Sequence, residues 1–184
     1  MKKIIIIAAA LVGFTLNANA QNATANATQN VSLTLANAIS ITFTGTGTST
    51  GAAVNLPFST VSDYANGVTS TAQQLMVQSN LPFGISVKSN AANFTYSGTY
   101  TTGTTMPVSG VLKLIVPANA TGGTIAAPFT AGTYASVTAT AQNLINNGTY
   151  GANQTFSVQY KATPGFTYPA GTYTTQVIYT ATQQ

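Results

Sequence analysis

Apolar residues alternate with polar or small residues from position 31 to position 43, and this alternation constrains the fold more than any other feature of the sequence. A period of two is typical of a β-strand with one buried face. The segment is longer than the usual strand of about five or six residues. It therefore predicts two successive strands, or one strand plus an arm, with the joint near Asn37. The apolar positions are all odd-numbered: Val31, Leu33, Leu35, Ile39, Ile41 and Phe43.

The rest of the chain predicts further short strands and almost no helix. No window of ten residues carries a helical apolar stripe, and clusters of Gly, Pro, Asn and Ser separate the apolar runs. Seven to nine short strands in one domain favour a β-sandwich or a β-barrel. The expected strands are 75–77, 83–87, 94–96, 108–116, 134–139, 156–162 and 173–181.

Turn-forming residues suggest how some of these strands are joined. The loop TPGFTYPAG at 163–171 contains two prolines, so the strands on either side of it are expected to form an antiparallel pair. Residues 117–119 and 146–148 are expected to lie in turns. The run TGTGTSTG at 44–51 is expected to be a loop because glycine weakens a strand.

The chain has almost no charged side chains, and this excludes most catalytic chemistry. It contains five Lys, one Asp (Asp63) and no Arg, Glu, His, Cys or Trp. Without His and Cys there is no ordinary zinc, haem or iron–sulfur site, and no Ser-His-Asp or Cys-His arrangement. A single carboxylate side chain cannot form a catalytic carboxylate pair. We therefore expect a non-enzyme that uses no cofactor and no metal.

The N-terminus predicts export from the cytoplasm. Lys2 and Lys3 precede an apolar run at 4–14, and Ala18-Asn19-Ala20 fits a signal-peptidase site, so residues 1–20 are expected to be a signal peptide. A polar low-complexity lead at 21–29 and a single domain at 30–184 are expected to follow. The processed chain would carry three Lys and one Asp, hence a side-chain charge of 3 − 1 = +2. So little charge argues against nucleic-acid binding, and no other segment is long enough to be an integral membrane span.

Two further segments resemble one known family. Residues 168–173, YPAGTY, lead into an alternating strand that ends at the C-terminus, and residues 75–87, LMVQSNLPFGISV, read as strand, polar turn and strand. Together with the segment 31–43, they resemble the spore-coat-protein-U-like domain, the fold of archaic chaperone–usher pilins. The chain lacks the Cys pair that many members of that family carry.

The resemblance implies an incomplete immunoglobulin-like β-sandwich that is completed by strand addition. In that family a periplasmic chaperone lends the missing strand, an outer-membrane usher assembles the subunits, and the N-terminal arm of the next subunit replaces the chaperone. The segment 31–43 would then supply the donor strand, with Val31, Leu33 and Leu35 as its plugs. The wider set of polymerisation candidates is Val31, Leu33, Leu35, Ile39, Ile41 and Phe43.

Three functions remain open from the sequence. The first is a structural subunit of a bacterial surface filament that forms a homopolymer by donor-strand-type β-augmentation. The second is a monomeric secreted module that binds a surface or a glycan through Tyr64, Phe94, Tyr96 and Tyr100. The third, a secreted ice-active or matrix protein, depends only on the threonines spaced two apart at positions 42 to 50.

Overall fold

The computed structural model describes residues 25–45, 51, 53–130 and 132–184. The chain divides into two units, Met1–Leu35 and Ala36–Gln184. The predicted signal peptide, residues 21–24 of the polar lead and residues 46–50 of the threonine run lie outside the described residues. In the first unit, residues 25–35 have no regular secondary structure.

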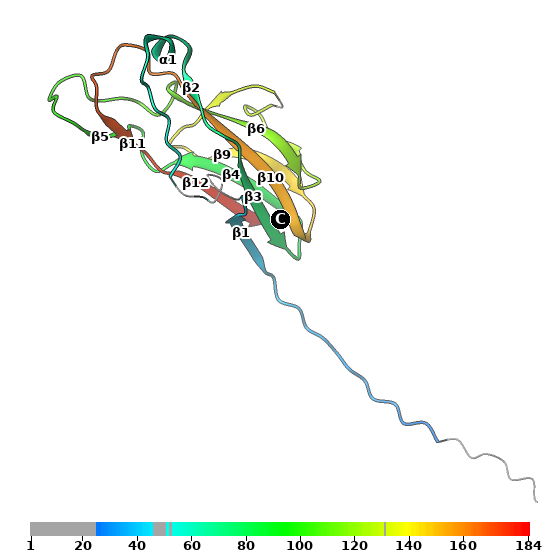
Figure 1. Cartoon of the computed structure of the whole chain (residues 1–184). Coiled ribbons are helices and arrows are strands. Elements are labelled where there is room, and N and C mark those ends of the chain that lie inside the picture. The colour runs from blue at the N-terminus through cyan, green and yellow to red at the C-terminus, as the bar shows by residue number, and fades with distance from the viewer. Residues whose placement is uncertain (1–24, 46–50, 52, 131) are drawn as a thin grey trace, which may run out of the picture. The chain divides into compact units, whose positions relative to one another are not determined.

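The described part of the second unit contains twelve strands and one short helix (Figure 1). In chain order they are β1 (Ile39–Phe43), α1 (Val61–Asn66), β2 (Val68–Thr69), β3 (Gln73–Ser79), β4 (Phe83–Ser89), β5 (Thr95–Ser97), β6 (Leu112–Ala120), β7 (Thr124–Ile125), β8 (Ala135–Ser136), β9 (Gln142–Gly148), β10 (Gly151–Ala162), β11 (Thr172–Thr174) and β12 (Val177–Gln183).

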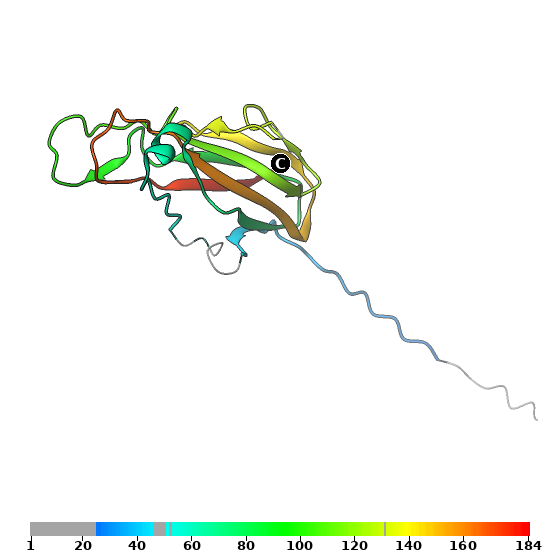
Figure 2. The ribbon, with the colours of Figure 1, turned by 45° about the horizontal axis from the view of Figure 1, so that its top comes forward.

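The strands form an all-β sandwich, as the sequence predicts. One antiparallel sheet has the order β1-β3-β10-β6-β8, with β2 also pairing to β10, and the second has the order β12-β4-β9-β7. A small additional sheet pairs β11 with β5. The turned view shows the two main sheets as layers that face each other (Figure 2). Strands β1 and β12 are therefore edge strands of different sheets.

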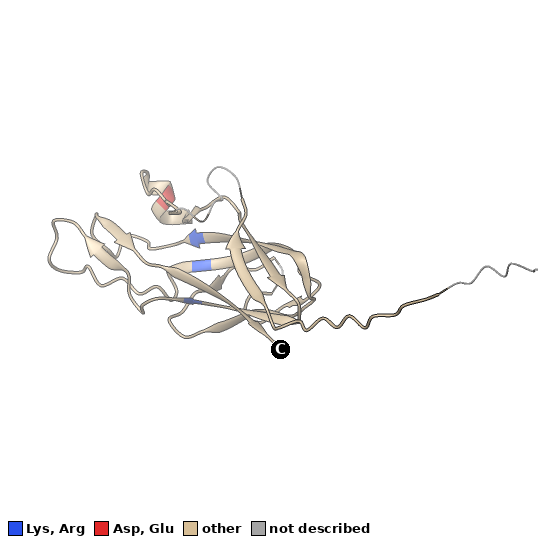
Figure 3. Ribbon diagram, turned by 90° about the horizontal axis from the view of Figure 1, so that it is seen from below, with Lys and Arg blue, Asp and Glu red and all other residues tan. Residues whose placement is uncertain are grey.

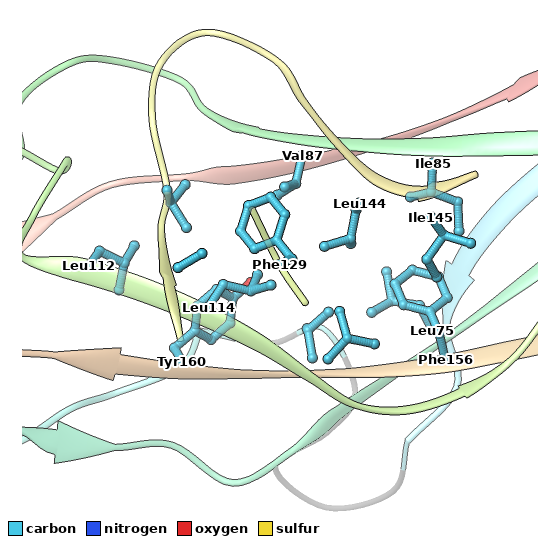
Figure 4. Packing of buried hydrophobic residues seen from close by; sticks show 14 of the residues in the cluster. Leu75, Ile85, Val87, Leu112, Leu114, Phe129, Leu144, Ile145, Phe156 and Tyr160 are labelled. Carbon is cyan, nitrogen blue, oxygen red and sulfur yellow. The ribbon is translucent and has the colours of Figure 1, made fainter. Parts of the chain in front are cut away.

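The core lies between the two main sheets (Figure 4). Alternation places it there, since every second residue of β3 and β4 is buried. Three phenylalanines, Phe83, Phe129 and Phe156, are at most 1% exposed. Burial of a side chain of this size stabilises a fold by roughly 1.5–3 kcal/mol, so packing between the sheets is the main source of stability.

The prediction that the strands at 156–162 and 173–181 pair with each other is wrong. The first lies in β10, which pairs with β3, β6 and β2. The second is divided into β11 and β12, and β12 pairs with β4 in the opposite sheet. The alternating apolar faces of β10 and β12 meet across the core instead, where the rings of Phe156 and Tyr179 lie 6.4 Å apart.

The strand–turn–strand segment at 75–87 is an arch between the sheets, because β3 and β4 belong to different sheets. Residues 117–119, predicted as a turn, continue β6 instead. The β10–β6 register shifts between Ser157 and Gln159, so Pro117 lies in an irregular part of the ladder that does not need its missing N–H. Strand β6 also begins later than predicted, at Leu112, and β8 is shorter than the expected 134–139.

The only Asp of the chain caps helix α1. The carboxylate of Asp63 accepts hydrogen bonds from the backbone N–H groups of Ser59 and Thr60, at 2.9 and 2.7 Å, and the Thr60 hydroxyl accepts from Asp63 N–H at 3.2 Å. These hydrogen bonds, that from Ser59 first, hold the pKa of Asp63 below its ordinary value of 3.8. Asp63 is thus a helix-capping residue.

The few charged residues are spread over separate elements. Lys88 lies on β4, Lys113 on β6 and Lys161 on β10, while Asp63 lies on the helix (Figure 3). Among the described residues, no helix is long and apolar enough to cross a bilayer.

Candidate functional site

The arm, which we define as residues 25–35, carries three large apolar side chains that are not buried. Val31, Leu33 and Leu35 are 78%, 84% and 82% exposed. The sequence alternation predicts a buried face here, but the chain in isolation does not bury it. Large apolar side chains that alternate along an extended segment are suited to fill pockets in a sheet that lacks a strand.

The other three polymerisation candidates are already part of the second unit's own sheet. Ile39, Ile41 and Phe43 lie on β1, which pairs with β3 over its whole length. Ile39 and Ile41 are half-buried and pack against the core cluster. The joint predicted near Asn37 therefore separates two different environments. Of the six candidates, Val31, Leu33 and Leu35 lie outside the second unit's sheet and are exposed.

Strand β12 offers one free edge. On one side it pairs with β4 at every residue from Val177 to Gln183. On the other side, no strand among the described residues pairs with it. Its inward side chains, including Val177, Tyr179 and Ala181, remain half-buried although they pack against the core. An edge of unpaired N–H and C=O groups beside incompletely covered apolar side chains can accept another strand.

Strand β1 closes this open side next to the C-terminal part of β12, from Tyr179 to Gln183. The rings of Phe43 and Tyr179 meet edge to face with their centroids 6.2 Å apart. The Gln183 side chain donates a hydrogen bond to the Ala38 carbonyl oxygen at 2.9 Å. Asn80 fixes the start of β1, because it donates to the Ala36 carbonyl at 2.7 Å and accepts from the Ala38 N–H at 2.9 Å.

Beyond the end of β1, the open side becomes a groove of about 1020 Å³. Residues 53–58 form one wall and residues 171–178 form the other. The buried residues at its base include Gln73, Leu112 and Tyr160. None of the described residues that line it is charged. The groove therefore suits an uncharged, largely apolar occupant.

The groove is long enough to hold the apolar part of the arm. Residues 172–178, which comprise β11, a two-residue link and the first two residues of β12, border the groove and would extend about 23 Å at the strand rise of about 3.3 Å per residue. Residues 31–35 would extend about 16 Å on the same basis. A strand of that length fits along this edge.

Two tyrosine hydroxyls join the two main sheets, and one of the two residues, Tyr160, also lines the groove. The hydroxyl oxygens of Tyr160 on β10 and Tyr179 on β12 lie 2.7 Å apart. Burial raises the pKa of Tyr160 to about 12, an effect that the hydrogen bond to Tyr179 partly offsets. Burial, followed by the neighbouring Tyr160, raises the pKa of Tyr179 well above its ordinary value. Both hydroxyls are thus held neutral, and the pair positions β12 against the opposite sheet.

The four aromatic residues proposed for glycan binding do not form one exposed face. Tyr64 stacks on Phe166 with centroids 5.1 Å apart, while Tyr96 packs against Tyr173 at 5.0 Å. Tyr100 is 55% exposed, whereas the other three are half-buried. Tyr64 and Phe94 line the groove.

The sequence did not predict the groove. Residues 53–58 and Gln73 carry no local pattern that distinguishes them from loop and strand residues elsewhere. They become neighbours only because the sheets leave this side open. The ending YPAGTY was the one available signal, since its last three residues, 171–173, lie in the groove wall.

No protein-family model matches this chain, and no curated protein matches its sequence. The function must therefore be argued from the groove, the free edge of β12 and the arm.

Proposed function

We propose that this protein is a structural subunit of a bacterial surface filament, and that the arm of one copy completes the sandwich of the next. The observation that carries the proposal is the free edge of β12 beside an uncharged groove with core residues at its base. The exposed alternation of Val31, Leu33 and Leu35 supports a donor of matching pattern in the same chain. Main-chain hydrogen bonds to residues 171–177, which include β11 and the first residue of β12, supply binding strength, and the alternate side chains supply fit.

The proposal includes export and assistance before assembly. A subunit with an unfilled apolar groove exposes surface that favours aggregation. A periplasmic chaperone that covers the groove, and an outer-membrane usher that exchanges it for the next arm, would solve this problem. The predicted signal peptide is consistent with that route, and the proposed site of the assembled subunit is the cell surface.

The test is a denaturing gel of the surface fraction with and without boiling. A strand buried in a neighbour dissociates slowly, so the unboiled protein is expected to form a ladder of multimers that collapses on boiling. The variant Leu33→Asp/Leu35→Asp places two carboxylates in the groove, which an apolar site does not tolerate. It is expected to give monomer only.

The matched control uses the opposite face of the same segment. Ser32→Asp/Thr34→Asp adds the same charges at positions that alternate away from the groove, so its ladder should persist. A normal ladder from Leu33→Asp/Leu35→Asp would refute the proposal.

A second candidate is a monomeric secreted module that binds a glycan or another surface. The observation that favours it is the set of rings in the groove wall, including Phe58, Tyr64 and Tyr173. This hypothesis predicts one monomer band in both lanes, and an arm that can be removed without loss of stability.

A further inference from the structure

One buried hydrogen-bond acceptor in the groove has no partner among the residues that the structure describes. Gln73 is 1% exposed and lines the groove. Its Nε2 donates to the hydroxyl and the carbonyl oxygen of Thr71, at 3.2 and 3.4 Å. Its Oε1 accepts no hydrogen bond from any described residue. A buried acceptor without a donor is costly, so Gln73 indicates that a donor is missing at this point of the groove.

Gln73 lies at the closed end of the groove. Phe43, the last residue of β1, pairs with Leu75, and Thr44 N–H donates to the Gln74 carbonyl oxygen at 3.0 Å. Tyr179 packs against both Phe43 and Phe156, and Phe156 also pairs with Leu75. Tyr179 is therefore level with Leu75, and Val177, two residues earlier on β12, is level with Gln73.

The closed end determines the direction of an added strand. Strand β1 fills the space beside β12 from Tyr179 to Gln183. A strand from another copy must therefore enter the groove at the opposite end, near Gly171. Its own domain stays outside, and the arm joins that domain at Ala36. Leu35 therefore stays near the mouth, and the residues before it reach deeper. The added strand runs antiparallel to residues 171–177, which comprise β11, the link to β12 and the first residue of β12.

The alternation of the arm places an amide at the deepest point. The positions that share a face with Val31, Leu33 and Leu35 continue to Gln29 on the N-terminal side and to Asn37 on the other. Asn37 lies between Ala36 and Ala38, which Asn80 holds in the donor's own domain. Gln29 is therefore the amide that can enter the groove.

We propose that the side-chain amide of Gln29 from a second copy donates a hydrogen bond to Oε1 of Gln73. This bond sets the register of the added strand, with Gln29 opposite Val177 and Leu35 opposite Gly171. The inference rests on the proposed function, since it concerns the arm in the groove of a neighbour. The hydrogen bond would be lost if the added strand shifted by two residues along the groove. The apolar side chains of Val31, Leu33 and Leu35 alone would tolerate such a shift.

Disulfide mapping tests this register directly, because the natural chain has no cysteine. In the proposed register Asn30 lies opposite Gln176, and both side chains point away from the core. The variant Asn30→Cys/Gln176→Cys should give oxidised multimers that survive boiling until a reductant is added, since paired residues lie within the 4.4–6.8 Å that a disulfide spans. Control pairs shift the register by two in either direction: Asn30→Cys/Thr174→Cys and Asn30→Cys/Ile178→Cys. Preferential cross-linking of either control, or a disulfide within a monomer, overturns the proposal.

A double-mutant cycle tests the hydrogen bond itself. Gln29→Met leaves Gln73 without its donor, and Gln73→Met leaves Gln29 without its acceptor, so each should speed dissociation of the multimer by roughly 10- to 100-fold. The double variant removes both polar groups and should dissociate at close to the wild-type rate. Asn30→Met is the control on the outer face and should have no effect.

The outcomes separate the two proposals. If the wild type forms no heat-sensitive multimers, the filament proposal fails and this inference fails with it. If multimers form but Gln29→Met dissociates at the wild-type rate, only the hydrogen bond is refuted. Should Gln73→Met fail to fold, the surface cysteine pairs and Gln29→Met still decide the question.

Discussion

Replacement of Tyr179 by Phe should destabilise the domain more than replacement of both Tyr160 and Tyr179. The Tyr160 side chain is 8% exposed, and the two hydroxyl oxygens lie 2.7 Å apart. In Tyr179→Phe the hydroxyl of Tyr160 stays buried without that partner, which costs about 1–3 kcal/mol. In Tyr160→Phe/Tyr179→Phe no unpaired hydroxyl remains, so the free energy of unfolding should return to within about 1 kcal/mol of the wild type. Urea unfolding of unpolymerised protein measures these values.

The same pair predicts a loss of stability in alkali. Burial raises the pKa of Tyr160 from 10.0 to about 12. A raised pKa means that the folded state favours the neutral hydroxyl, so this stabilisation is complete below pH 10 and is lost as the pH rises through 12. Two pKa units correspond to about 3 kcal/mol. Equal stability of the single and double Phe variants, or an unfolding free energy that stays constant up to pH 12, would refute this reasoning.

Three further predictions follow from other parts of the fold. Gly67→Ala should lower the free energy of unfolding by more than about 1 kcal/mol in the same urea assay, because Gly67 has φ of +79° and an added Cβ would lie 2.5 Å from the Ala162 carbonyl oxygen. Asn80→Ala should speed hydrogen exchange at the Ala38 amide about tenfold or more, since that N–H donates to Asn80; unchanged protection would contradict the assigned role. The temperature at which multimers dissociate should be the same in low and high salt, because no described groove residue is charged; a strong salt dependence would point to a different interface.

Strands with strict alternation were predictable because their signal is local. Residues 75–77, 83–87 and 156–162 all lie in strands, and their apolar side chains face one core. Strand β9 escaped prediction, because its buried residues Leu144 and Ile145 are adjacent rather than alternate. The β4–β9 register shifts next to this point, between Ile85 and Ser86, so an irregular ladder accommodates two consecutive buried side chains.

Strand pairing was less accessible than strand position. The alternating faces of β10 and β12 indicate which side chains are buried, but two strands look the same whether they share a sheet or face each other across a core. The loop at 163–171 suggested a hairpin, whereas β12 lies in the sheet opposite β10. Pairing depends on contacts between residues far apart in sequence, which a local pattern does not contain.

The amino-acid sequence by itself determined the all-β class and the alternation of apolar residues along the arm, because period-two alternation and turn residues act over a few neighbouring positions. It also determined how few ionisable groups are present, since that is composition alone. Only the tertiary structure decided which strand edges stay open, since an edge is free when no distant segment pairs with it. The groove beside β12 and the acceptor of Gln73, which has no partner among the described residues, are features that only the tertiary structure decided. The groove lies beside an edge of β12 with which no described strand pairs, and such pairing depends on segments far apart in the sequence.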